Sequence, residues 1–80
     1  MMDAQARRLL WRCRRGMKEL DLLLERFARR HLPAAEGGEI ELFARFLELP
    51  DPVLAEYLLG APEQGEADFS RLARRIVEVR

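Results

Sequence analysis

The chain has a single cysteine and a single histidine among its 80 residues. One cysteine excludes an internal disulfide, and two such residues are too few for a structural zinc site, which typically takes four ligands. Apolar runs are also short, and none approaches the roughly 20 residues that cross a bilayer. The N-terminus lacks the apolar stretch and small-residue cleavage site of a secretory signal. We therefore expect a cytoplasmic protein with no metal centre and no membrane insertion.

No stretch of useful length alternates with the period of a β-strand. A glycine-rich phosphate loop and the strand that would carry it are both missing, which excludes a dinucleotide-binding fold. Apolar residues instead recur at three- and four-residue steps. With 49% hydrophobic and 35% charged residues, the composition is globular and not disordered. We predict an all-α fold, a compact five-helix bundle that forms a single small domain over residues 1–80.

The expected helices cover about residues 4–14, 17–31, 39–48, 52–59 and 67–78. Asp3 is a plausible N-cap of the first helix, and Asp51 of the fourth, with Pro52 at the first helical position. Gly16 would cost up to about 1 kcal/mol inside a helix, so we interpret it as a corner between two helices. Gly60 is expected to end the fourth helix. The apolar stripes predict the following core residues: Ala6, Leu9, Leu10, Cys13 and Met17; Leu20, Leu23, Leu24, Phe27 and His31; Ile40, Phe43, Ala44 and Leu47; Phe69, Leu72, Ala73 and Ile76.

Charge is unevenly distributed, although the formal net charge is zero. Residues 1–35 hold nine Lys/Arg and four Asp/Glu, residues 36–68 hold one Arg and nine Asp/Glu, and residues 69–80 hold four Arg and one Glu. Such polarity favours steered docking onto a protein partner. It argues against a uniformly basic nucleic-acid surface.

The most informative segment is Arg15-Gly16-x-x-Glu19. If both charged residues are helical, they share a face and form a surface salt bridge worth a few tenths of a kcal/mol. A second interpretation is a docking element. Gly16 lacks a Cβ and lets another backbone approach closely, and an arginine grips carboxylates or carbonyls with a rigid fork.

Trp11 falls in a stripe with basic residues and not with the core positions; the stripe is Arg7, Trp11, Arg14 and Lys18. An aromatic among arginines is typical of an interface anchor. Trp11 could equally be a partly buried lid on a small core. Aromatic and arginine side chains also suit single-stranded nucleic acid, but the acidic middle of the chain and the lack of a recognisable nucleic-acid motif disfavour that partner.

The residue types of nucleophilic catalysis are present but poorly placed. Cys13 lies on an apolar face, where a free cysteine is usually a small buried hydrophobe. The only histidine, His31, is eighteen residues away on another predicted helix, so no activating base is at hand. We expect His31 to end the second helix, where a cation interacts well with the helix dipole. The carboxylates Glu36, Glu39 and Glu41 fit a solvated loop and helix start. We therefore expect no active site.

Further residues surround the motif in a distinctive pattern. Upstream stand Ala6, Arg7, Trp11 and Cys13; downstream stand Leu20 and Asp21; later come Arg45-x-Leu47-Glu48, Asp51-Pro52-x-Leu54 and Tyr57-Leu58. Over about residues 6–60 the chain resembles the FAD assembly factor family (SdhE). Tyr57 stands where the family usually has Trp. The last twenty residues match only loosely, and the chain ends at Arg80, before the longer tail of some members.

The resemblance implies a five-helix bundle that binds the flavoprotein subunit of succinate dehydrogenase, and in some bacteria that of fumarate reductase. Binding would promote covalent attachment of FAD to a flavoprotein histidine, with no catalytic group from this chain and no stably bound cofactor of its own. We expect a monomer. The partner-binding residues carried over are Arg15, Gly16 and Glu19, flanked by Arg7, Trp11, Arg14, Met17, Lys18 and Asp21. The alternative is a regulatory protein-binding module, since family members are also described as antitoxin-like partners of a membrane protein.

Overall fold

The computed structural model describes residues 4–60 and 65–78. They form five α-helices and a short 3-10 turn: α1 (Ala4–Arg12), α2 (Lys18–His31), η1 (Leu32–Ala34), α3 (Gly37–Leu47), α4 (Asp51–Leu59) and α5 (Ala67–Glu78). No strand occurs in these ranges, so the predicted all-α class is confirmed. The predicted helix ends differ from the observed ones by two residues at most. None of the described helices has the length and apolarity needed to cross a membrane.

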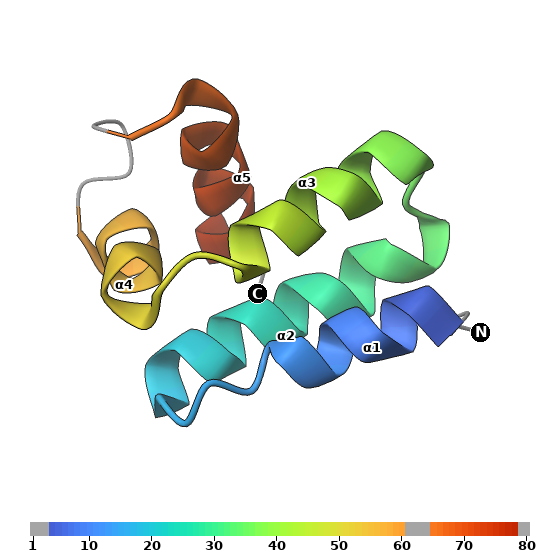
Figure 1. Cartoon of the computed structure of the whole chain (residues 1–80), viewed down its shortest axis with the longest axis horizontal. Helices are drawn as coiled ribbons and strands as arrows, with labels where there is room; N and C mark the ends of the chain where they lie inside the picture. The colour runs from blue at the N-terminus through green and yellow to red at the C-terminus, as the bar shows by residue number, and fades with distance from the viewer. Residues whose placement is uncertain (1–3, 61–64, 79–80) are drawn as a thin grey trace.

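The first three helices run alternately to and fro, with α2 lying antiparallel beside α1 (Figure 1). The chain then turns into α4, and α5 packs against α2, α3 and α4. Two corners of the bundle lie close to each other. One joins α1 to α2, and the other joins α3 to α4, and α1 itself contacts α3.

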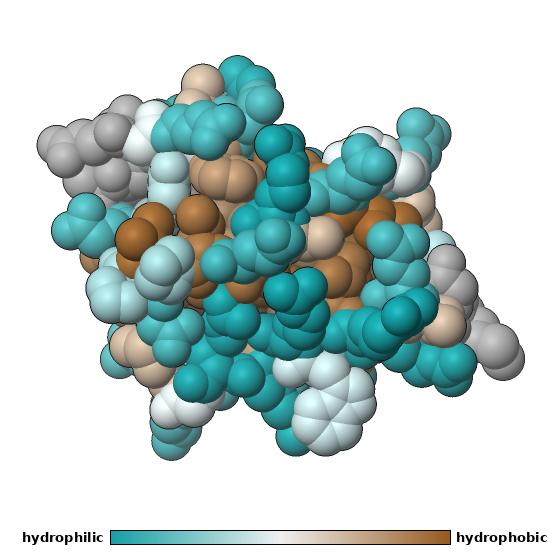
Figure 2. Space-filling view, in the orientation of Figure 1, coloured by the Kyte–Doolittle hydropathy of each residue, from teal (hydrophilic) through white to brown (hydrophobic). Residues whose placement is uncertain are grey.

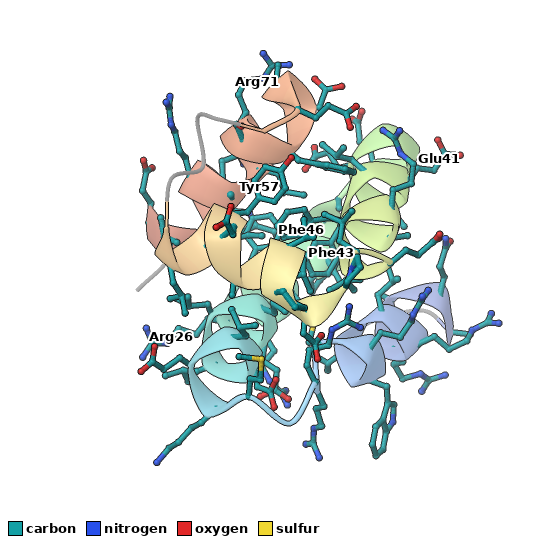
Figure 3. The ribbon with its side chains drawn as sticks, turned by 60° about the vertical axis from the view of Figure 1, so that its left-hand side comes forward. Arg26, Glu41, Phe43, Phe46, Tyr57 and Arg71 are labelled. Atoms are coloured by element: carbon teal, nitrogen blue, oxygen red, sulfur yellow. The ribbon has the colours of Figure 1, made fainter. Side chains whose placement is uncertain are left out.

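Aromatic residues of α3 fill the centre of the bundle. Phe43 and Phe46 are almost completely buried and point inward from the helix, whereas Glu41 points away from it (Figure 3). The ring of Phe46 lies 5.5 Å from that of Phe69 and 5.6 Å from that of Tyr57, centroid to centroid. Such pairs add to the roughly 1.5–3 kcal/mol that burying each large apolar side chain contributes.

Most of the predicted core is confirmed. The buried members are Ala6, Leu9, Cys13, Leu20, Leu24, Phe27, Phe43, Leu47, Phe69, Leu72, Ala73 and Ile76; Leu10, Leu23, His31, Ile40 and Ala44 are half-buried. The prediction that Met17 is a core residue is wrong, because α1 ends at Arg12 and Met17 lies exposed before the start of α2. Phe46 was missed, although it lies three residues after Phe43 on the same face.

The predicted helix ends have mixed outcomes. His31 ends α2 and Gly60 follows the last residue of α4, as expected. Asp51 is not the N-cap of α4. The carbonyl of Pro50 accepts the first helical hydrogen bond, from the N–H of Leu54 at 3.0 Å, and the carboxylate of Asp51 has another partner, described below. Asp3 lies outside the described residues.

Tyr57 links the two C-terminal helices. Its hydroxyl accepts a hydrogen bond of 2.8 Å from the backbone N–H of Glu66, at the start of α5. A Cβ added to Gly65 would overlap this tyrosine ring. Tyr57 is therefore a packing residue that also fixes where α5 begins.

Candidate functional site

The corner between α1 and α2 carries the R-G-x-x-E motif. Gly16 has a φ of +85° and is the one described residue with a positive φ, which confirms it as a corner. A side chain is strained in this conformation. A Cβ built on Gly16 meets no atom within 4 Å, so the space above it is open. The backbone conformation favours glycine here, while the surroundings leave room for an approaching surface.

Asp21 holds the backbone of this corner. Its Oδ1 accepts a hydrogen bond of 2.8 Å from the N–H of Arg15, and its Oδ2 accepts one of 3.2 Å from the N–H of Gly16. Asp21 lies in the first turn of α2, where the helix dipole favours a carboxylate. Asp21, one of the predicted flanking residues, is half-buried, and both of its carboxylate oxygens accept hydrogen bonds from the same chain.

The side chain of Arg15 points into the molecule and is only 17% exposed. Its Nη2 donates to the carbonyl of Leu47 and, at 3.0 Å, to the carbonyl of Leu49. Its Nη1 donates to the carbonyl of Arg12 at 3.3 Å. Its Nε lies 3.2 Å from Oδ1 of Asp51, as an ion pair rather than an aligned hydrogen bond. One guanidinium therefore ties the end of α1 to the end of α3 and the start of α4.

These contacts rule out the surface salt bridge between Arg15 and Glu19, which was one of the two interpretations of the motif. Arg15 is not helical, because α2 begins only at Lys18, so the four-residue spacing does not place the two side chains on one helix face. Glu19 lies exposed in the first turn of α2. The motif thus divides into an inward arginine and an outward Gly16 and Glu19.

Trp11 stands on the exposed side of the corner. The residue is 71% exposed, which excludes the alternative of a partly buried lid on the core. The guanidinium of Arg14 lies 5.1 Å from the centre of the Trp11 ring, and Arg14 Nε lies 3.1 Å from a carboxylate oxygen of Glu25 on α2. Cation–π and ionic contacts thus connect the tryptophan to the second helix.

Two shallow depressions meet at Glu25. One is lined by Leu10, Trp11, Arg14, Glu25 and Arg29, and the other by Gly16, Lys18, Asp21, Leu22 and Glu25.

We call the exposed side of this corner the corner face; it consists of Trp11, Arg14, Gly16, Met17, Lys18, Glu19 and Leu22. Hydrophilic side chains gather over α1 and α2 in Figure 2, below a band of hydrophobic surface across the middle of that view. Of the predicted flanking residues, Arg7 is exposed farther back along α1.

Cys13 and His31 are poorly suited to catalysis. The Cys13 thiol is fully buried and donates to the carbonyl of Leu9 at 3.3 Å. Burial, helped by the nearby Glu25, raises the pKa of Cys13 to about 12. The His31 ring lies 4.6 Å from that of Phe27. Partial burial and the charge of Arg75 lower the pKa of His31, which corrects the expectation of a helix-capping cation.

Metal ligation finds no support in the part of the chain that the structure describes, where no three His, Cys, Asp or Glu residues cluster suitably. Glu36, Glu39 and Glu41 are exposed, and Glu39 lies 3.6 Å from Arg75 of α5.

The internal partners of Arg15 are not predictable from the local sequence pattern. Leu47, Leu49 and Asp51 lie more than thirty residues beyond Arg15, so no helical period connects them to it. The nearest signal was indirect. A glycine corner at position 16 removes Arg15 from the second helix, and its side chain must then find partners elsewhere.

Comparison with known proteins accounts for nearly the whole chain. Residues 7–80 match the model of the Sdh5 family, described as flavinator of succinate dehydrogenase. FAD assembly factor SdhE of Coxiella burnetii is 38% identical over 74 residues, which are 92% of this chain and 90% of the relative. The protein of the same name from Legionella pneumophila strain Paris is 40% identical over 63 residues, covering 79% and 80%. That from Pseudomonas aeruginosa is 32% identical over 76 residues, covering 95% and 90%. No solved structure gives a significant match. The chain therefore belongs to the Sdh5 family of succinate dehydrogenase flavinators.

Proposed function

We propose that this chain is an FAD assembly factor that binds the flavoprotein subunit of succinate dehydrogenase and promotes covalent attachment of FAD to it. The family match over residues 7–80 supports the process. The corner face supports the surface, because it presents an open glycine beside an exposed tryptophan and an exposed carboxylate. Aromatic anchors surrounded by polar groups are typical of protein interfaces. The single observation on which the choice of surface depends is the 71% exposure of Trp11 at the corner that carries the motif.

Flavinylation would be accelerated by positioning. Holding FAD and the flavoprotein's target histidine in near-attack geometry lowers the entropic part of the barrier. In this proposal the chain donates no catalytic group. The buried Cys13, whose raised pKa keeps it a thiol at neutral pH, is consistent with that role.

We extend the proposal to the flavoprotein of fumarate reductase, which the family resemblance also implies as a partner. The chain would act as a monomer in the cytoplasm. A pull-down separates this function from a regulatory module, because the flavoprotein should dominate the captured proteins.

The direct test reconstitutes flavinylation from purified flavoprotein lacking FAD, added FAD and this chain. Covalent flavin is read by its fluorescence on the denatured subunit. We expect the chain to raise the flavinylated fraction and Glu19→Ala to slow this several-fold. Glu19 is exposed, so the substitution should change the free energy of unfolding by no more than about 0.5 kcal/mol.

Glu41→Ala is the matched control, since Glu41 is an exposed glutamate on α3 that points to solvent (Figure 3). It should flavinylate at the wild-type rate. A wild-type chain that leaves the rate unchanged would refute the function. Equal rates for the two variants would refute the surface.

A further inference from the structure

The arginine of the motif is built into the protein and not onto its surface. The side chain of Arg15 is 17% exposed, whereas that of its neighbour Arg14 is 61% exposed. Every nitrogen of the Arg15 guanidinium lies against a carbonyl or a carboxylate of the same chain. A side chain with this many internal partners has little left to offer to another protein.

The partners of Arg15 are groups that need a donor. Leu47 is the last residue of α3 and Leu49 lies two residues beyond it, after the C-cap Glu48. Their carbonyls therefore belong to a helix end where intrahelical donors run out. The dipole makes that end negative, which favours a cation. Only a planar fork with several N–H groups can reach both carbonyls and Asp51 together, and a lysine ammonium cannot.

The corner is consequently fixed on two sides. Asp21 binds the N–H groups of Arg15 and Gly16 from the α2 side. The Arg15 side chain binds the α3–α4 corner from the other side. Gly16 and Glu19 stay exposed between these attachments.

We propose that Arg15 is a positioning residue: it locks the α1–α2 corner onto the α3–α4 corner and so holds Gly16 and Glu19 in the docking conformation, without itself contacting the flavoprotein. The inference rests on the proposed function for its consequence, but its structural half concerns the isolated chain. A surface that is docking-competent in only a fraction of molecules binds with its Kd divided by that fraction. If loosening leaves about a tenth of the molecules competent, the apparent Kd rises about tenfold.

The first experiment measures amide hydrogen exchange in the isolated chain. Arg15→Lys keeps the charge but cannot make the fork, so we expect exchange of the Gly16 amide to accelerate by about tenfold while core amides of α5 stay protected. Arg26→Lys, on an exposed arginine of α2 that points to solvent (Figure 3), should change nothing. An unaltered Gly16 amide in a folded Arg15→Lys variant would overturn the proposal, whatever the partner does.

The second experiment measures affinity for the purified flavoprotein subunit. Arg15→Lys should raise Kd about tenfold, and Asp51→Asn, which weakens the same attachment more gently, should raise it less. The double variant should bind no worse than Arg15→Lys alone, because Asp51 acts through Arg15. Ile76→Val lowers the melting temperature from the far helix α5 and should leave Kd unchanged, which separates positioning from general stability.

Additive losses in the double variant would overturn the proposal. So would weaker binding by Arg15→Lys without faster exchange at Gly16, because that combination means direct contact of the arginine with the partner. Failure of the wild-type chain to bind the flavoprotein would refute the proposed function instead, and the exchange measurement would still decide the role of Arg15.

Discussion

Gly16 is constrained by its backbone and open on its surface, and these two properties can be separated by substitution. With φ at +85°, Gly16→Ala should lower the free energy of unfolding by about 1 kcal/mol. Gly16→Asn should lower it less, because asparagine tolerates the left-handed region. Gly37→Ala, at the start of α3 and equally free of neighbouring atoms, should be neutral within about 0.5 kcal/mol. Urea denaturation of the three variants checks the order.

Substitutions at Gly16 should also change binding of the flavoprotein. Gly16→Arg has room for its side chain, so we expect the bundle to stay folded by circular dichroism while flavoprotein binding is lost. Gly16→Asn, which is closer to wild type in stability, should already weaken binding. If a folded Gly16→Arg variant bound normally, Gly16 would serve only the turn.

Cys13 predicts how stability depends on alkaline pH. Its pKa is raised from 9.0 to about 12 in the folded protein, so the native state favours the neutral thiol. The neutral thiol contributes fully to the free energy of unfolding below pH 9. This contribution is lost as the pH rises from about 9 toward 12, at up to about 1.4 kcal/mol per pH unit. Denaturant unfolding between pH 8 and 10.5 should show this slope in the wild type and a smaller one in Cys13→Ser. Parallel slopes would mean that the thiol ionises freely in the native state.

At the scale of helices, the sequence predicts what is local. The periods of Leu20, Leu24 and Phe27, and of Phe69, Leu72 and Ile76, place both helices and their buried faces correctly. A three-to-four-residue repeat is a property of the segment itself, so no knowledge of the rest of the chain is needed.

The contacts between helices could not be predicted in this way. A salt bridge of Arg15 with Glu19, four residues on, was one of two interpretations of the motif, whereas Arg15 binds Leu47, Leu49 and Asp51. Asp51 was expected to cap α4 for the same local reason. Arg15 and Asp51 instead bind groups that are distant in the sequence. The packing of α1 against α3 brings these groups within reach. The corner at Gly16 was predictable from the sequence. Its attachment to the α3–α4 corner through Arg15 was not.

The end of α2 gives a prediction for acidic pH. His31 packs over Phe27 beside the guanidinium of Arg75, and burial together with Arg75 and Arg30 lowers its pKa from 6.5. The native state therefore favours the neutral imidazole. The neutral imidazole contributes fully to the free energy of unfolding above pH 6.5. This contribution is lost as the pH falls through the pKa of His31 in the folded protein. The melting temperature should fall between pH 7.5 and 5 in the wild type, and less steeply in His31→Gln. An equal fall in both would assign the acid sensitivity to the carboxylates.

For the whole molecule, the charged segments of the sequence partly neutralise one another. Arg15 from the basic N-terminal segment pairs with Asp51, and Arg75 from the basic C-terminal segment lies 3.6 Å from Glu39. The uneven charge of the linear sequence is thus used partly to hold helices together. What remains exposed at the corner face is of mixed sign, with Arg14, Lys18 and Glu19. Such a face can meet a partner of alternating charge, and single-sign steering is not required.

The chain should assist FAD attachment without carrying FAD. The backbone N–H groups of Arg15 and Gly16, which could otherwise face a phosphate, already donate to Asp21. We therefore expect the purified protein to be colourless and to bind free FAD with a Kd no tighter than about 10 µM, or about −6.8 kcal/mol. Quenching of flavin fluorescence in a titration measures this. The same preparation should still raise covalent flavinylation of the flavoprotein, and folded Cys13→Ser and His31→Gln variants should retain most of that activity. A yellow protein with stoichiometric FAD would make the chain a flavin carrier, and complete loss of activity in a folded Cys13→Ser variant would make it a transferase.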